Sequence, residues 1–213
     1  DAPIVLECAP EEIAWQQADI KESTKAYIGP WNMEVFQTIR SYPNIKHLYE
    51  SFPDKKIFRQ TLEINPSVNS PAKAETALGN KNIHLSDWGK DIISKTKFSQ
   101  TKEKYDLVRF TVNQLGFPKG ATTDEVYKRA KDLGLELCPA EVGPHLRLQY
   151  PGKEWMLIAM KQISGRHGDP YVFSLLSDGG KLKLYGYYAD PGDRWLGDHK
   201  FVFRSRKLDS KKL

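Results

Sequence analysis

Cysteine is scarce in this sequence, and long apolar runs are missing from it. The 213 residues include two cysteines, Cys8 and Cys138. Two cysteines are too few for a disulfide-dense scaffold or a four-cysteine zinc site, which leaves one disulfide or two unpaired thiols as alternatives. No apolar run approaches the ~18 residues that a membrane-spanning helix needs, so the sequence predicts no membrane span.

Signatures of the common enzyme classes are missing as well. The five histidines show neither H-x-H nor H-E-x-x-H spacing, and there is no G-x-S-x-G, P-loop or G-x-G-x-x-G motif. Asp190, Asp193 and Asp198 surround a Pro-Gly turn, where aspartate is common, without the spacing of a calcium loop. We expect no metal and no cofactor, and the sequence leaves open whether the protein is an enzyme.

The composition is that of an ordinary soluble globular protein. Hydrophobic residues make up 39% of the chain and charged residues 28%, which argues against global disorder. The net charge of +5 at pH 7 is modest; basic patches can attract nucleic acid or anionic surfaces, but most such proteins are simply solvated. Because the chain begins at Asp1 without a methionine, we expect a cytoplasmic protein, a protein secreted after removal of a signal peptide, or a fragment.

Helical patterns dominate the first two thirds of the chain. We expect an N-terminal helical region over residues 1–64, ending in a strand over 56–64, and a second helical region over 65–134. Ser70, Ser86 and Thr122 are placed to cap helices in the second region, and Glu125 completes a capping box with Thr122. The helices expected there cover residues 72–78, 87–95, 102–115 and 123–133.

Short segments of alternating hydrophobicity follow from residue 135. The five strands expected there are His145–Tyr150, Glu154–Ile163, Tyr171–Ser177, Lys181–Ala189 and His199–Lys207. The turns between them are too short to join parallel neighbours, so we predict an antiparallel β domain over 135–207 and a basic tail over 208–213. The predicted fold class is α+β, a helical N-terminal part followed by a five-stranded antiparallel meander sheet or small half-open barrel.

The segment Leu133–Tyr150 (LGLELCPAEVGPHLRLQY) resembles a segment of uncharacterised bacterial proteins. In those proteins it likewise follows a Thr-Thr-Asp-capped helix and precedes a strand-rich C-terminal end. The resemblance covers roughly the last half of the chain. It implies a bacterial origin and one shared module. It implies no activity, so no functional residue is carried over from it.

Two histidines and an arginine form the first candidate site. The predicted strands place His145 and Arg147 on one strand face, and His167 in the polar loop after the next strand. A metal-independent nuclease needs a base and an acid with pKa values near neutrality, and a cation for the developing phosphate charge. These three residues could supply such catalytic groups, although an exposed strand histidine beside a polar turn has the same pattern.

A basic and aromatic strand face forms the second candidate site. Alternation over residues 181–189 puts Lys181, Lys183, Tyr185 and Tyr187 on one face, and Arg204 on the last strand is a further cationic candidate. Aromatic rings stack on bases or sugars while nearby cations neutralise phosphates, as in sheet-based binders of single strands. An ordinary solvated sheet face has a similar composition.

These observations favour a binding or interaction protein. Its basic and aromatic sheet face would take an anionic ligand, either nucleic acid or a glycan, or a protein partner. The alternative is a small metal-independent nuclease or toxin-like effector that uses His145, Arg147 and His167. Cleavage of labelled RNA in EDTA that is lost in His145→Ala would favour the nuclease, whereas binding without cleavage would favour the binding protein. The oligomeric state is left open.

Overall fold

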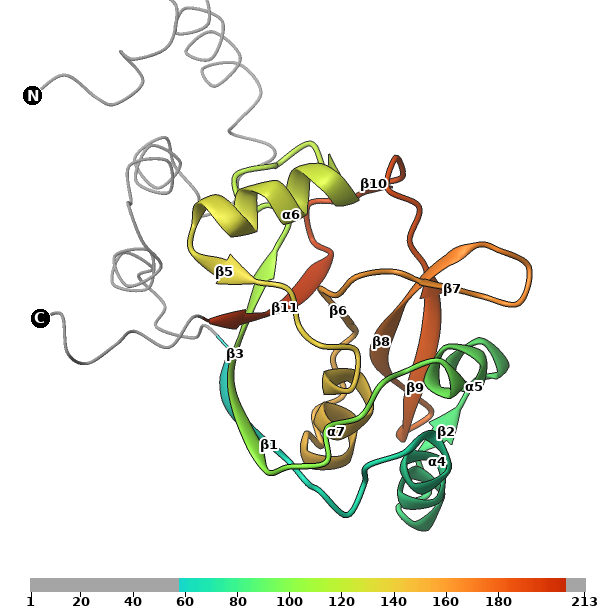
Figure 1. Cartoon of the computed structure of the whole chain (residues 1–213). Helices are drawn as coiled ribbons and strands as arrows, with labels where there is room; N and C mark the ends of the chain where they lie inside the picture. The colour runs from blue at the N-terminus through green and yellow to red at the C-terminus, as the bar shows by residue number, and fades with distance from the viewer. Residues whose placement is uncertain (1–57, 206–213) are drawn as a thin grey trace, which may run out of the picture.

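A sheet of nine strands forms the centre of the computed structural model, which describes residues 58–205 (Figure 1). Seven of the strands follow one another across the sheet in the order β1 (Arg59–Ile64), β3 (Glu103–Thr111), β11 (Lys200–Ser205), β6 (Met156–Ile158), β8 (Pro170–Asp178), β9 (Lys181–Tyr188) and β2 (His84–Leu85). Two short strands, β5 (Leu135–Glu136) and β7 (Ile163–Ser164), pair with β11 and β8. A separate two-stranded sheet joins β4 (Ala121–Thr122) to β10 (Arg194–Trp195).

The predicted antiparallel meander is wrong. The sheet is mixed, because β11 pairs in parallel with β6 and β2 pairs in parallel with β9. Strand β11 does not lie beside β9 but is inserted between β3 and β6. Strand β3 comes from the region 65–134 that we predicted to be helical. The fold is therefore a mixed α/β fold in which strands from both halves of the described chain share one sheet.

Residues 102–115, predicted to be a helix, form β3 and the turn that follows it. Consecutive residues Leu107 and Val108 are both buried, so both faces of the strand are covered there. A strand buried on both faces loses the alternation by which strands are recognised in a sequence. Its pairing with β1 on one side and β11 on the other outweighs the helical spacing of its apolar residues.

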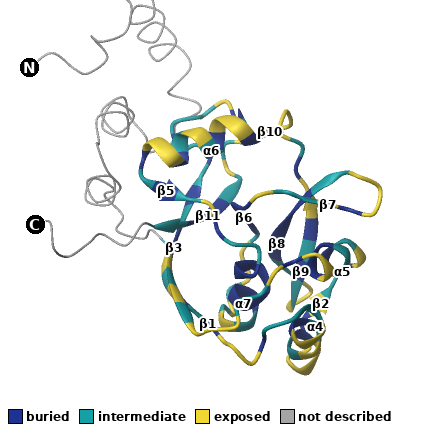
Figure 2. Cartoon of the chain, in the orientation of Figure 1, coloured by how far each residue is buried: buried dark blue, intermediate teal, exposed yellow. Residues whose placement is uncertain are grey.

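Four helices pack against the sheet in the described part of the chain: α4 (Pro71–Asn80), α5 (Asp87–Ser94), α6 (Thr123–Asp132) and α7 (Val142–Gln149). The first three begin as the sequence predicts. The hydroxyls of Ser70 and Ser86 each accept the backbone N–H three residues on, and Thr122 and Glu125 form the predicted capping box. The outward faces of α4 and α6 are exposed (Figure 2).

Helix α7 overturns the prediction of a strand over His145–Tyr150. It lies on the inner side of the curved sheet, in contact with β1 on one side and with β8 and β9 on the other (Figure 1). Residues 142–147 are all buried, so α7 has no solvent-facing side over most of its length (Figure 2). Pro144 is compatible with this helix because it lies in the first turn, where backbone N–H groups have no helical partner.

Strand register shows which side chains share a face of the sheet. Tyr185 on β9 is opposite Ser174 on β8, Ser174 is opposite Leu157 on β6, and Leu157 is opposite Phe201 on β11. These four side chains therefore lie on one face. Helix α6 covers that face at β11, where the ring of Tyr127 meets the ring of Phe201 edge-on with centroids 6.3 Å apart.

Helix α5 covers the opposite face at β9. A Cβ atom on Gly186 would lie 2.7 Å from the backbone of Trp88, so only glycine allows this close approach of α5 to the strand. Leu184, on the same face as Gly186, is fully buried. The odd-numbered side chains of β9 consequently point to the face that α5 does not cover.

The remaining strand predictions are confirmed in part. Strands β8 and β9 form the predicted hairpin, in which Gly179 and Gly180 have φ angles of +55° and +79°, as a tight primed turn requires. The strand predicted over 154–163 is shorter, since β6 ends at Ile158. Among residues 58–205, no helix is long and apolar enough to cross a membrane.

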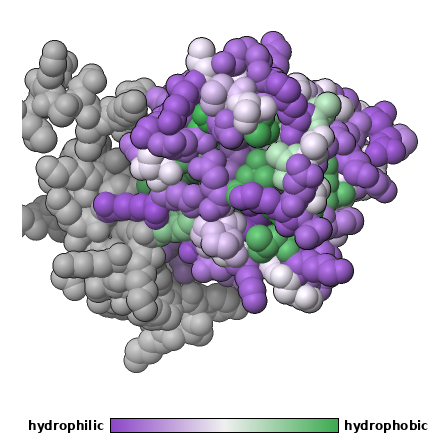
Figure 3. All heavy atoms as spheres, turned by 90° about the horizontal axis from the view of Figure 1, so that it is seen from below, coloured by the Kyte–Doolittle hydropathy of each residue, from purple (hydrophilic) through white to green (hydrophobic). Residues whose placement is uncertain are grey.

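Side chains of the core are drawn from every layer of the described fold, and the face seen in Figure 3 is mainly hydrophilic, with small separate hydrophobic patches. Residues 1–57 of the predicted N-terminal helical region, the thiol of Cys8 and the basic tail predicted over 208–213 lie outside the described residues. Cys138 is buried, and its burial raises the pKa of the thiol to about 12, so it is protonated and unreactive at neutral pH.

Candidate functional site

Four of the predicted binding residues form a row on the face of β9 that α5 does not cover. Lys181, Lys183, Tyr185 and Tyr187 alternate with residues that face α5, and we call these four residues the β9 strip. Lys181 and Tyr187 are exposed, and Lys183 and Tyr185 are half-buried. Successive members of the strip are two residues apart, a separation of about 7 Å along the strand. The strip therefore offers two cations followed by two phenol rings in one line.

The two lysines of the strip lie beside a cavity at the edge of the sheet. The cavity has a volume of about 710 Å³ and is bounded by the end of α4, by β2 and by Lys181 and Lys183. His84 on β2 also lines it; His84 is opposite Lys183 in the parallel β2–β9 pair, and its ring centroid lies 6.0 Å from that of Tyr185. An exposed imidazole thus extends the strip onto the neighbouring strand.

Lys183 is held by an acidic neighbour at the hairpin. Its Nζ donates a hydrogen bond of 2.7 Å to Oδ2 of Asp178, and this contact raises the pKa of the lysine and lowers that of the carboxyl group. The ammonium group also lies 5.9 Å from the ring centroid of Tyr185. The Asp178 side chain is 72% exposed, whereas the Lys183 side chain is 17% exposed, so an anionic ligand could displace the carboxylate but would reach Lys183 only from the side of Asp178.

The other end of the strip runs into a cluster of aromatic side chains. The ring of Tyr187 lies 5.5 Å from that of Trp155 and 5.8 Å from that of Trp195. Trp195 is buried and anchored by a 2.8 Å hydrogen bond from its indole N–H to Oγ1 of Thr123. Trp155 is half-buried, and Tyr187 is 39% exposed. Tyr187 therefore has a fixed position and an accessible ring.

The chain matches no family model, no curated protein and no solved structure. The resemblance of Leu133–Tyr150 to bacterial proteins stays a prediction.

Arg204, the fifth predicted binding residue, does not join the β9 strip. It lies three residues after Phe201, which shares a face with Tyr185, so strand alternation places Arg204 on the opposite face. Its guanidinium group pairs with the Glu136 carboxylate and lies 5.3 Å from the ring centroid of Tyr105. The charge of Arg204 is thereby engaged on a strand that β6 and β8 separate from β9.

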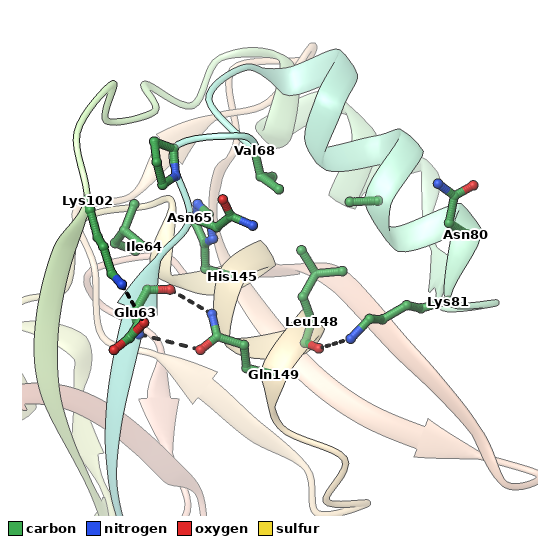
Figure 4. Close-up of a pocket in the computed structure, with 12 residues that line it drawn as sticks. Glu63, Ile64, Asn65, Val68, Asn80, Lys81, Lys102, His145, Leu148 and Gln149 are labelled. Atoms are coloured by element: carbon green, nitrogen blue, oxygen red, sulfur yellow. Dashed lines mark hydrogen bonds and ion pairs between the residues drawn. The ribbon is translucent and has the colours of Figure 1, made fainter.

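His145 lies inside the molecule rather than on a strand face. The side chain is 1% exposed and lines a cavity between β1, α4 and α7 (Figure 4). Burial lowers the pKa of His145 to about 4, although the nearby Val68 backbone offsets part of this effect. The imidazole is neutral at pH 7.

Arg147, two residues further along α7, is buried as well. It is 1% exposed, and its Nη2 donates to the carbonyl oxygens of Tyr150 and Gly152. Its Nε and Nη1 have no hydrogen-bond partner among the described residues, and burial lowers the pKa of the guanidinium group. This arginine holds the turn after α7 and is not accessible to a substrate phosphate.

His167, the third residue of the predicted nuclease site, is exposed in the loop between β7 and β8. Its ring lies 5.8 Å from that of Trp88 on α5, and the same loop is tied to α5 by a 2.8 Å hydrogen bond from the Arg166 N–H to the Asp91 carboxylate. His145, by contrast, contacts the ring of Phe98. The two imidazoles thus have separate surroundings, on different elements of the fold.

Sequence reasoning missed His84, Asp178 and Trp155, which complete the surroundings of the β9 strip. Asp178 had a local signal, because it ends the strand before the Gly-Gly turn and faces the next strand across the hairpin. His84 and Trp155 had none, since each is brought to β9 by long-range packing. Within residues 58–205 there is no group of three His, Cys, Asp or Glu side chains placed to hold a metal ion.

Proposed function

We propose that the chain binds single-stranded nucleic acid along the β9 strip. The observation that carries this proposal is the order of side chains on the face of β9 opposite α5, with Lys181 and Lys183 at one end and Tyr185 and Tyr187 at the other. Phosphates of a single strand need cations, and unstacked bases need flat rings on which to stack. Both kinds of group are present here within four alternate residues.

The cavity beside the strip supports the part of the proposal that concerns the backbone phosphates. Lys181, Lys183 and His84 converge on it from two paired strands, and all three can donate hydrogen bonds to an anion. Asp178 is the acidic group bonded to Lys183, and it is exposed enough to be displaced. The backbone phosphates of the ligand would therefore lie at the hairpin end of β9.

The aromatic end of the β9 strip supports the part of the proposal that concerns base stacking. Tyr187 is braced by Trp155 and by the buried Trp195, so little side-chain freedom is left to be lost when a base stacks on it. Stacking of a base on an aromatic ring contributes about 1–3 kcal/mol and tolerates any base. We therefore expect binding with little sequence preference and a strong dependence on salt.

The double variant Lys181→Glu/Lys183→Glu reverses both charges and is expected to bind a labelled oligouridylate more weakly by a factor on the order of 10 to 100. The slope of log affinity against log salt should also become shallower by about 1.4, because each phosphate contact on a single strand contributes about 0.7. Fluorescence anisotropy titrations at several salt concentrations measure both quantities.

The matched control is Lys128→Glu/Lys131→Glu, which makes the same change in net charge at two exposed positions of α6. If this control weakens binding as much as the β9 variant does, the attraction is a property of the overall charge and the strip has no special role. Unaltered binding in the β9 variant would contradict the proposal outright.

The alternative of a metal-independent nuclease has no observation in its favour. It requires His145, Arg147 and His167 to meet at one substrate. His145 is neutral and enclosed, the Arg147 guanidinium group donates to backbone carbonyls, and His167 packs beside α5. A general base works best with a pKa near the working pH, and a pKa of about 4 makes His145 a weak base.

A further inference from the structure

The cavity beside the β9 strip lies where the strip ends. Strand β9 begins at Lys181, directly after the Gly179-Gly180 turn, so the strand has no further residue to extend the strip on that side. Gly79 near the end of α4 and Asn82 just after it line the cavity, and Figure 1 shows α4 and β2 beside the hairpin end of β9. A ligand that follows the strip from its aromatic end therefore meets α4 at the cavity.

Two of the three basic side chains at this cavity have no polar partner. Lys181 and His84 are exposed, and within residues 58–205 neither side chain forms a hydrogen bond or an ion pair. The third, Lys183, donates to Asp178, and a ligand reaches it from the side of that exposed carboxylate. None of the described residues that line the cavity is acidic. The cavity therefore has basic groups to offer and no carboxylate of its own.

The end of α4 would oppose an anion if its last carbonyl oxygens were unbonded. The N–H groups of Lys81 and Ile83 donate to the Leu78 carbonyl oxygen at 3.1 and 3.0 Å. The N–H of Asn82 donates to the Gly79 carbonyl oxygen at 2.9 Å, and Asn82 has the left-handed φ of +54° that is common at such helix ends. These carbonyl oxygens are thus bonded within the chain, and the Asn82 side-chain amide can donate to an anion in the cavity.

The number of basic groups fits the end of a strand better than its interior. A phosphate inside a nucleic acid carries one negative charge and has two oxygens outside its ester bonds. A terminal phosphate carries a charge of about −1.5 to −2 at pH 7 and presents three acceptor oxygens. Lys181, Lys183 and His84 supply three side chains that can donate to those oxygens, from two paired strands.

We propose that this cavity binds the terminal phosphate of a single strand whose bases stack on Tyr185 and Tyr187. The inference rests on the proposed binding of nucleic acid by the β9 strip, and it names the class of ligand as strands that end in a phosphate. The shared chemistry is a phosphate monoester, which a strand can carry at its 5′ or its 3′ end.

The test compares three unlabelled hexauridylates by isothermal titration calorimetry with the full chain. One carries a 5′-phosphate, one a 3′-phosphate, and one has hydroxyl groups at both ends. One of the two phosphorylated strands is expected to bind about tenfold more tightly than the hydroxyl-ended strand, because only one chain direction brings its phosphate to the cavity. This gain should fall to about twofold or less in His84→Gln and in Lys181→Gln.

His167→Gln and Lys90→Gln are the matched controls, because both residues are exposed and neither lines the cavity. Both should keep the full gain. The inference is overturned if both phosphorylated strands gain equally, or if the controls lose the gain as His84→Gln and Lys181→Gln do.

Equal binding of the three strands also overturns the inference. If Lys181→Glu/Lys183→Glu still weakens the binding in that case, the proposed function stands and only the terminal phosphate is rejected. Absence of binding by all three strands would reject the inference and the proposed function together.

Discussion

When the pH is lowered from 6.5 to 4, the free energy of unfolding of the wild-type protein is expected to fall by on the order of 2 to 3 kcal/mol more than that of a His145→Gln variant. His145 is enclosed by α7, α4 and the segment around Val68, and this burial lowers its pKa from 6.5 to about 4. The wild-type protein therefore becomes less stable in mild acid for a reason that one substitution removes.

The direction of this stability change depends on whether the folded or the unfolded chain protonates His145 first as the pH falls. Above pH 6.5 the imidazole is neutral in both the folded and the unfolded chain, so its contribution to stability is fully present. As the pH falls from 6.5 towards 4, the unfolded chain takes up a proton that the folded chain does not, and stability is lost over that interval. His199 is half-buried and its pKa is lowered too, so only the difference between the two proteins reports on His145.

Urea unfolding of both proteins at several pH values between 4 and 7 measures this difference. A His167→Gln variant retains the buried imidazole and controls for the loss of a histidine as such. Parallel curves of stability against pH for the wild type and His145→Gln would mean that His145 is not buried in the folded protein, and the placement of α7 would then be incorrect.

The second large effect is expected at Gly143. A Cβ atom there would lie 2.6 Å from the ring of Phe173 on β8, closer than side chains tolerate, and Phe173 is fully buried. Overpacking typically costs about 1–3 kcal/mol, and three contacts below 3.0 Å with a fully buried ring place Gly143 at the upper end of that range, while alanine gains about 1 kcal/mol over glycine from helix propensity. Gly143→Ala should therefore lower the free energy of unfolding by about 2 kcal/mol.

Gly79→Ala provides the control, because Gly79 also lies in a helix, α4, and a Cβ atom there would have nothing within 4 Å. This variant should gain about 0.5–1 kcal/mol. The contrast in sign depends only on whether the helix position packs against the sheet. Equal stabilisation in both variants would show that α7 does not lie against β8.

Local signals allowed single elements of this fold to be predicted, but not its architecture. The caps at Ser70 and Ser86 and the capping box at Thr122 each depend on residues within one turn, and the Gly179-Gly180 hairpin fixes the register of β8 and β9. Local chemistry of this kind acts in the same way whatever surrounds it. Three helix starts and one hairpin were accordingly predicted correctly.

The predictions for α7 and β3 were wrong because both elements are buried on all sides over part of their length. Polar and apolar side chains alternate around His145 and Arg147, and residues 142–147 are all buried because α7 packs against β1, α4, β8 and β9. Alternation therefore carried no information about a solvent-facing side. The opposite error arose at β3, where burial of both faces removed the alternation and left a spacing that fits a helix.

The residues of the candidate site likewise fall into those that a local pattern predicted and those that only long-range packing brings together. The four residues of the β9 strip were predicted because they belong to one strand whose alternation is intact. Arg204 was assigned to them on composition alone, and the order of strands separates it from β9. His84 could not have been found from the sequence, since the two-residue strand β2 pairs with β9 across nearly a hundred residues of chain.

The affinity of an Asp178→Asn variant for oligouridylate tests the central proposal most directly, because damage to the fold does not produce tighter binding. Asp178 forms the ion pair with Lys183, and the substitution releases that cation for a phosphate without altering the strip itself. We expect this variant to bind several-fold more tightly than the wild type at low salt, with the gain abolished when Lys183→Glu is added. Equal or weaker binding by Asp178→Asn would contradict the assignment of nucleic-acid binding to β9.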